Sequence, residues 1–192
     1  MLHKSLSVLL GRNDESFRID ANAPWYWADR MSFGRAEVLR GLDLAHLNAR
    51  FLQPARTVAG MQASFERNVL PVLGAHPGTT FNLVWPPYSM LVWVDFAQRD
   101  QLETTLRFKR YVAQAVQPLH NVQVTDLQGH VEITGNLDLY RDIYHFAPQV
   151  NRWMVERTCA GLDRENVATV DRFARELRDR LSAWRPPAVT GQ

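Results

Sequence analysis

An aspartate and a histidine stand three residues apart in the C-terminal half of the chain. Asp142 and His145 lie in segment 140–148, whose sequence reads YRDIYHFAP. A carboxylate at this spacing can fold back within one turn and accept the proton of one ring nitrogen, which leaves the other nitrogen available as a general base. The same spacing also arises where an aspartate caps a turn and a histidine is buried without a catalytic role, so both interpretations stay open here.

The elements around this pair predict an α/β fold. Residues 79–85 (TTFNLVW) and 121–127 (NVQVTDL) are short, rich in β-branched or aromatic residues, and predict buried strands. A helical region at about 89–117 separates them, and Pro118 ends it. A strand, a long helix and a strand make a right-handed crossover, so the strands are expected to be parallel. Ligands bind in such folds at the loops that follow the strands, and segment 140–148 follows the second one.

The rest of the chain predicts further helices and irregular segments within a single domain, residues 1–192. Three- and four-residue spacing of apolar side chains predicts helices at about 34–52, 56–74 and 164–184, the last capped by Asp163. Pro148 suits the first turn of a helix that ends near Gly161. Irregular structure is expected at residues 1–34 and 128–147, and a frayed tail at 186–192.

A wider pattern resembles the last block of the SGNH (GDSL-like) hydrolases. Residues 85–89 (WPPYS) close one strand, residues 121–124 (NVQV) begin the next, and Tyr140-x-Asp142-x-x-His145 leads into Val150-Asn151. Over about residues 69–166 the chain is similar to a group of uncharacterised bacterial proteins, distantly akin to D-alanyl-lipoteichoic-acid and alginate-acetylation proteins. The resemblance implies a three-layer α/β fold with a mostly parallel sheet flanked by helices. It also implies that Asp142 orients His145 and that His145 activates a serine for ester hydrolysis or acyl transfer.

The chain departs from this family at the nucleophile. The family's serine lies in a Gly-Asp-Ser or Gly-Ser-Ser turn after the first strand, and no such turn occurs here. We therefore expect an incomplete SGNH-like domain that is truncated or inactive. Ser89, at a strand end and a helix start, is one substitute nucleophile, although a serine there is usually a cap. Gly11-Arg12-Asn13-Asp14 resembles the family block whose asparagine donates to the oxyanion. The resemblance makes Asn13 a candidate for that donor, worth roughly 3 kcal/mol, unless Gly11 merely ends a helix.

Aromatic and basic residues suggest where a crevice and a solvated face lie. Trp85, Tyr88 and Tyr144 are candidates for the mouth of a substrate crevice, with core packing as the alternative. The small basic cluster of Arg107, Lys109 and Arg110 predicts the solvated face of a helix.

Composition excludes several other classes of function. The chain has 192 residues, is 46% hydrophobic and 22% charged, and carries a net charge of +2, which argues against nucleic acid as a partner. Its one cysteine, Cys159, excludes an intrachain disulfide and a Cys-rich zinc site. No apolar run approaches the ~18 residues of a membrane helix. No Gly-rich phosphate loop or local ligand cluster is present, so neither a metal nor another cofactor is expected.

Two functional hypotheses follow from the sequence. The first is an SGNH-like acyl-ester hydrolase or acyltransferase domain that acts on an acylated small molecule or glycan. The alternative is a non-catalytic binding or structural module of the same fold, in which Asp142 and His145 are remnants. The compartment and the oligomeric state stay open, although the family's full-length members often have a membrane anchor and act outside the cytoplasm.

Overall fold

The computed structural model describes residues 31–40, 42–44, 47 and 56–186. All contacts reported below lie within residues 33–192, which form one compact unit of the chain. Asn13, most of the predicted irregular segment 1–34, and the tail from residue 187 lie outside the described residues.

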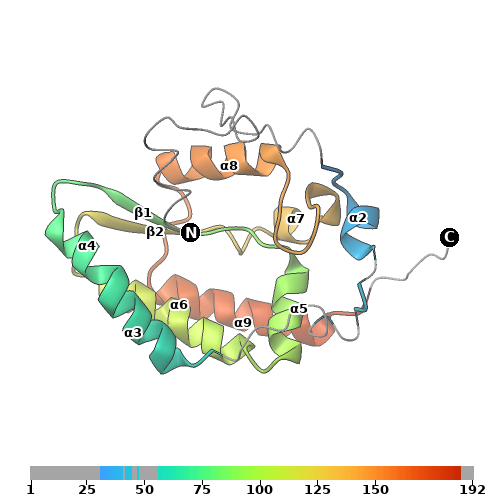
Figure 1. The fold of residues 1–192 in the computed structure, drawn as a ribbon, viewed down its shortest axis with the longest axis horizontal. Helices are drawn as coiled ribbons and strands as arrows, with labels where there is room; N and C mark the ends of the chain where they lie inside the picture. Colours follow the sequence, from blue (N-terminus) through green and yellow to red (C-terminus); the bar gives the residue numbers. More distant parts are fainter. Residues whose placement is uncertain (1–30, 41, 45–46, 48–55, 187–192) are drawn as a thin grey trace, which may run out of the picture. The chain divides into compact units, whose positions relative to one another are not determined.

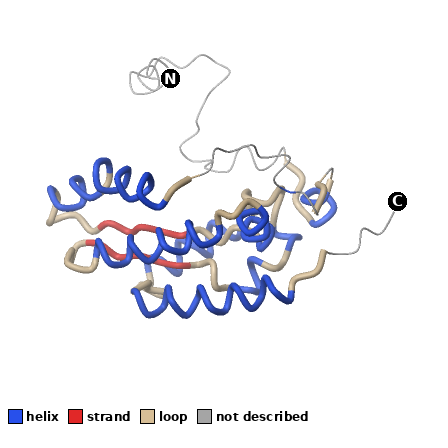
Figure 2. Tube along the Cα trace, turned by 90° about the horizontal axis from the view of Figure 1, so that it is seen from below, coloured by secondary structure: helices blue, strands red, loops and turns tan. Residues whose placement is uncertain are grey.

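Two parallel strands form the sheet of the described region. Strand β1 (Phe81–Trp85) pairs with β2 (Val122–Asp126), and Leu83 lies beside Val124 in the register. Figure 2 shows the two strands side by side. The two predicted strands and their parallel direction are thereby confirmed.

A short segment before the last helix covers the outer edge of β2. The backbone N–H of Glu165 donates to the carbonyl of Val124 at 2.8 Å, and the N–H of Asp126 donates to the carbonyl of Asp163 at 3.0 Å. Thr125 and Arg164 form an antiparallel bridge between these two hydrogen bonds. This pairing satisfies backbone groups that an open sheet edge would leave unpaired, and it brings Glu165 close to the carboxyl end of β2.

Helices connect and cover the strands. Side chains of α3, α4 and α6 share one hydrophobic cluster with β2, and α9 packs along α6, so these helices lie on one side of the sheet (Figure 1). Figure 1 shows α8 on the other side. The described residues therefore have the mixed α/β character that the sequence predicts, built on a small two-stranded sheet. The helices are α2 (Arg35–Leu39), α3 (Val58–Asn68), α4 (Leu70–Ala75), α5 (Met90–Gln98), α6 (Leu102–Val116), α7 (Val131–Thr134), the 3₁₀ turn η4 (Leu137–Leu139), α8 (Pro148–Cys159) and α9 (Val167–Ala183).

Three predicted helices differ from the observed ones in where they begin, break or end. The region 89–117 is two helices, α5 and α6, because Asp100 adopts a left-handed backbone conformation with a φ of 56°. The region 56–74 breaks at Val69, just before Pro71, whose ring nitrogen cannot donate within a helix. In the first predicted helix, 34–52, only Arg35–Leu39 is α-helical among the described residues.

Helices α8 and α9 follow their predictions more closely. Helix α8 begins at Pro148 as predicted. Helix α9 is capped by Asn166, which accepts from the backbone N–H of Thr169 at 3.0 Å while the Thr169 hydroxyl accepts from the N–H of Asn166 at 2.8 Å. The predicted cap, Asp163, is wrong: its φ is 56° and its carboxylate instead binds Arg157.

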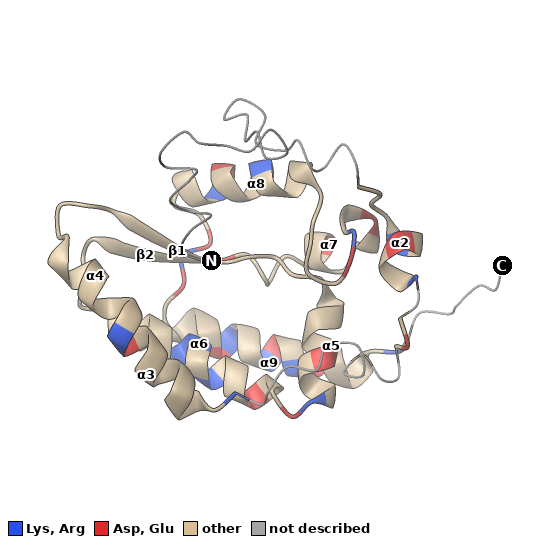
Figure 3. Cartoon of the chain, viewed as in Figure 1, with Lys and Arg blue, Asp and Glu red and all other residues tan. Residues whose placement is uncertain are grey.

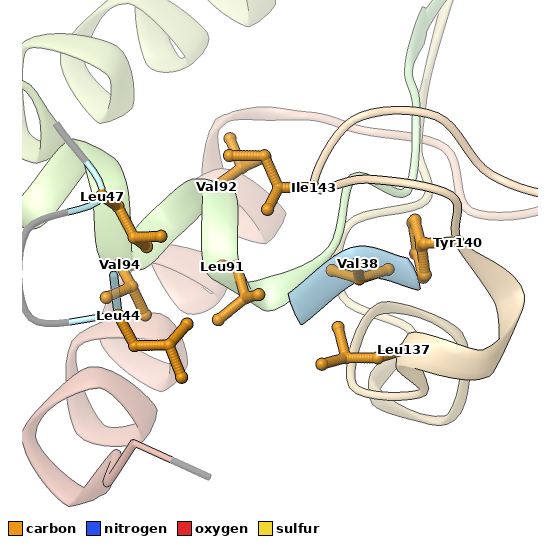
Figure 4. Packing of buried hydrophobic residues seen from close by; sticks show 9 residues of the cluster. All are labelled: Val38, Leu44, Leu47, Leu91, Val92, Val94, Leu137, Tyr140 and Ile143. Carbon is orange, nitrogen blue, oxygen red and sulfur yellow. The ribbon is translucent and has the colours of Figure 1, made fainter. Parts of the chain in front are cut away.

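Helix α5 is the centre of the core next to the candidate site. Its residues from Leu91 to Asp95 are all buried, so the helix is enclosed on every side. Figure 4 shows Leu91 and Val92 of this helix in one cluster with Tyr140 and Ile143 of the loop that carries Asp142 and His145. This apolar cluster holds the loop in place.

Candidate functional site

The loop that carries the Asp142–His145 pair is anchored to the segment that follows β1. The hydroxyl of Tyr140 donates to the carbonyl of Pro87 at 2.5 Å. The carbonyl of Ile143 accepts from the hydroxyl of Ser89 at 2.9 Å and from its backbone N–H at 3.2 Å. Tyr140 and Ile143 are fully buried, so both anchoring hydrogen bonds are shielded from water. The loop therefore lies next to the residues that leave the carboxyl end of β1.

Backbone pairing closes this loop into a small, tight unit. Tyr140 and Phe146 form an antiparallel bridge, and the N–H of Arg141 donates to the carbonyl of His145 at 2.8 Å. One carboxylate oxygen of Asp142, Oδ1, accepts from the backbone N–H groups of Tyr144 and His145, both at 2.8 Å. These bonds hold the aspartate over the turn and direct its second oxygen toward the histidine ring.

Asp142 and His145 form the predicted hydrogen bond. The distance between Asp142 Oδ2 and His145 Nδ1 is 2.7 Å. Burial by itself would raise the pKa of Asp142, but the hydrogen bonds from the Tyr144 and His145 backbones and from the His145 ring hold that pKa below its ordinary value. An ionised Asp142 keeps the proton of neutral His145 on Nδ1. Nε2 then has a free lone pair, and among the described residues it has no hydrogen-bond partner.

The pair is open to solvent at the edge of a pocket. The His145 side chain is 64% exposed and that of Asp142 is 41% exposed. Both line a pocket of about 270 Å³ between their loop and α2, together with Tyr144 and Ile143. A ligand in this pocket could therefore reach Nε2 without a change in the loop.

The predicted crevice residues separate into two groups. Tyr144 lines the pocket, and its ring packs edge to face on that of Tyr88 at 5.5 Å between centroids. Tyr88 and Trp85 are not among the lining residues. Trp85 instead packs edge to face on Phe108 of α6, and its indole N–H donates to Glu165. The prediction that Trp85 and Tyr88 line the crevice mouth does not hold for this pocket.

Ser89 lies at the start of α5, as its position in the sequence predicts, but it does not cap the helix with its side chain. The residue is 0% exposed, and its hydroxyl proton is used in the bond to the Ile143 carbonyl. These contacts join the segment that follows β1 to the loop that carries Asp142 and His145. A nucleophilic role for Ser89 stays a prediction, and it would require this hydroxyl to leave its present partner.

We expect Ser89→Ala to lower the free energy of unfolding by about 1 kcal/mol, because a buried carbonyl loses one of its two donors. Any esterase activity of the chain is expected to remain. Chemical denaturation and hydrolysis of 4-nitrophenyl acetate measure the two effects, with the exposed Ser64 replaced by alanine as the control. Loss of activity in a Ser89→Ala protein of unchanged stability would instead identify Ser89 as the nucleophile.

A second cluster of ionisable residues, which the sequence analysis missed, lies at the carboxyl end of β2. The ammonium of Lys109 contacts Asp126 Oδ2 at 2.8 Å, Gln128 Oε1 at 2.9 Å and Glu165 Oε2 at 3.4 Å. The same ammonium lies 4.9 Å from the ring centroid of Trp85 and 4.7 Å from that of Phe173. A buried cation needs partners of this kind, because it has lost its contacts with water.

The sequence predicts Lys109 on the solvated face of α6, and this prediction is wrong. The Lys109 side chain is only 1% exposed. Figure 3 shows acidic and basic residues interspersed along α6 and α9, and Arg107 and Arg110 are exposed as predicted. The burial of Lys109 could have been predicted from its three-residue spacing from Leu106 and from Val112, which places it on the apolar stripe of the helix.

Glu165 is the least expected member of this cluster. Burial raises its pKa to about 7; Lys109 opposes this shift and Asp126 adds to it. One oxygen accepts from the indole N–H of Trp85 at 2.8 Å, whereas the other lies at the longer distance of 3.4 Å from Lys109. Burial and the neighbouring Asp126 thus disfavour an ionised Glu165, and the single ammonium of Lys109 only partly offsets them.

The described residues contain no group of three or more histidine, cysteine, aspartate and glutamate side chains arranged to hold a metal ion. Within the same part of the chain, no helix has the length and apolar character needed to cross a membrane.

No model of a known protein family, no curated protein and no solved structure matches this chain.

Proposed function

We propose that the chain is an SGNH-like acyl-ester hydrolase or acyltransferase domain in which His145 is the general base. The 2.7 Å hydrogen bond from His145 Nδ1 to Asp142 carries the proposal. It is supported by the two backbone N–H groups that hold the carboxylate and by the opening of His145 onto a pocket. In this proposal the two strands belong to a three-layer, mostly parallel sheet of the SGNH type.

The pair would act on a hydroxyl group that attacks an ester. His145 Nε2 takes the proton of this hydroxyl while its oxygen forms a bond to the carbonyl carbon. The ionised Asp142 stabilises the imidazolium that results. When the tetrahedral intermediate collapses, the bond from that carbon to the alkoxide breaks and the alkoxide receives the proton from Nε2. No serine lines the pocket among the described residues, so water, an acceptor substrate or a serine from elsewhere supplies the hydroxyl.

We expect His145→Gln to lower kcat/KM for 4-nitrophenyl acetate by roughly 10²-fold or more, because proton transfer in the transition state loses its base. Asp142→Asn is expected to cause a smaller loss, because the asparagine still holds the loop but no longer stabilises the imidazolium. The control is His120→Gln, which replaces an exposed histidine after α6. Unchanged melting temperatures would show that the losses are chemical, since His145 makes its contacts at the surface.

The alternative is a non-catalytic binding or structural module of the same fold. The high exposure of His145 and the lack of a serine among the described pocket residues favour it. A stably folded wild-type protein with no hydrolysis above that of the His145→Gln variant would support this alternative and contradict the proposed activity.

A further inference from the structure

One of the two arginines that line the His145 pocket, Arg141, forms no ion pair within the described part of the chain. Besides His145 and Asp142, the pocket is lined by three charged residues: Glu37, Arg40 and Arg141. Arg40 forms an ion pair with Glu37 at 2.8 Å, and Asp142 binds His145 at 2.7 Å. Each carboxylate of the pocket therefore has a side chain in contact with it, and Arg141 is the lining arginine that has no such partner among the described residues.

Arg141 is held in place by its backbone but not by its side chain. Its N–H donates to the carbonyl of His145 at 2.8 Å, so the two residues face each other across the closed loop. The side chain is half-buried, and within the described part of the chain its guanidinium has no hydrogen bond or ion pair. A guanidinium presents five N–H donors in a fork that matches a carboxylate or a phosphate.

The remaining residues that line the pocket are mainly apolar, and the pocket itself is small. Val38 and Ile143 are buried, and Leu42 and Tyr144 are half-buried beside them. A volume of about 270 Å³ suits a short acyl chain better than a long lipid tail or an oligosaccharide. The pocket thus combines a short apolar wall, one arginine whose guanidinium has no partner among the described residues, and the free Nε2 of His145.

We propose that this pocket binds an acyl group that carries its own negative charge, such as a dicarboxylic half-ester, and that Arg141 is the residue that selects it. The inference rests on the proposed function, because it places the ester of that acyl group next to His145. It adds a substrate class that the Asp142–His145 pair alone does not specify. Arg141 acts in binding, and the proton transfers remain those of His145.

Binding of two uncleaved amide probes tests this inference without any need for turnover. N-phenylsuccinamic acid carries the terminal carboxylate, and butyranilide is its neutral counterpart of similar size. Titrations of ¹⁵N-labelled protein, followed at the backbone amides of residues 141–145, report binding at this loop. We expect the wild-type protein to bind the anionic probe roughly five- to tenfold more tightly than the neutral one.

Variants of Arg141 assign this preference to one side chain. In Arg141→Gln the two probes are expected to bind equally, whereas Arg141→Lys keeps part of the preference because the charge remains without the fork. Arg175→Gln, an exposed arginine of α9, serves as the control for net charge and is expected to bind like wild type. A wild-type protein without a preference, or a preference that survives in Arg141→Gln, overturns the inference.

Kinetics separate this inference from the proposed function. Preference for the anionic probe in a protein that hydrolyses neither 4-nitrophenyl hemisuccinate nor 4-nitrophenyl butyrate supports the binding role of Arg141 and contradicts the hydrolase. Hydrolysis of both esters with equal kcat/KM, abolished by His145→Gln, supports the hydrolase and overturns the role of Arg141.

Discussion

Replacing Lys109 with methionine is expected to lower the free energy of unfolding by about 3 kcal/mol. Methionine fills most of the volume of the lysine stem, so packing against Trp85 and Phe173 is largely kept. The lost ammonium removes the donor to Asp126 Oδ2 and to the side-chain carbonyl of Gln128, whereas Asp126 Oδ1 keeps the backbone N–H of Gln128. Removing one member of a buried ion pair costs far more than the pair contributes as a whole, because the partner's charge stays out of water.

Urea denaturation at pH 7 measures this effect. Arg107→Met serves as the control, because it makes the same kind of change at an exposed position of α6, where about 0.5 kcal/mol or less is expected. A loss below about 1 kcal/mol for Lys109→Met would contradict the buried network, since that size is typical of a surface ion pair.

Glu165→Gln is expected to raise stability at alkaline pH. The pKa of Glu165 is raised from an ordinary value of 4.5 to about 7 in the folded chain, chiefly by burial. Its contribution to stability is therefore full below about pH 4.5 and is lost as the pH rises through 7, because only the folded state holds the proton there. The amide of glutamine stays neutral at every pH. It can also accept from the indole N–H of Trp85, as the carboxyl group of Glu165 does.

The difference between the two proteins isolates the titration of Glu165. At pH 5 their free energies of unfolding are expected to be similar, and at pH 8.5 the glutamine variant is expected to be more stable by about 2 kcal/mol. Paired denaturation curves between these pH values check the trend, with the exposed Glu156→Gln on α8 as the control. A difference that does not change with pH would show that Glu165 is ionised in the folded chain throughout.

Local sequence signals predict part of the fold well. Pro148 begins α8 because a proline lacks the N–H that the first helical turn cannot use anyway. The strands β1 and β2 are predictable because each is a short β-branched or aromatic run, and the connection between them is long enough for a parallel crossover. The break between α5 and α6 is not predictable in this way, since it depends on the backbone of Asp100 and no proline or glycine marks it.

In the candidate site, too, local contacts are predictable from the sequence and tertiary contacts are not. The hydrogen bond between Asp142 and His145 is local, because three residues of backbone suffice to bring the two side chains together. The lining of their pocket is not local: α2 contributes to it, whereas Trp85 turns away to contact Phe108 and Glu165. Strand direction and aromatic character therefore predict a crevice in this region but not which side chains line it.

The sequence by itself determined the parallel strands, the start of α8 and the contact between Asp142 and His145, because short-range sterics and one turn of chain are enough for each. Only the tertiary structure decided that Ser89 is enclosed against Ile143 and that Lys109 meets Asp126 and Glu165 in the interior. These contacts join residues that are distant in the chain, and their energies depend on burial. Whether a charge lies in water or in the interior is set by how the helices pack on the sheet, which no local pattern of residues specifies.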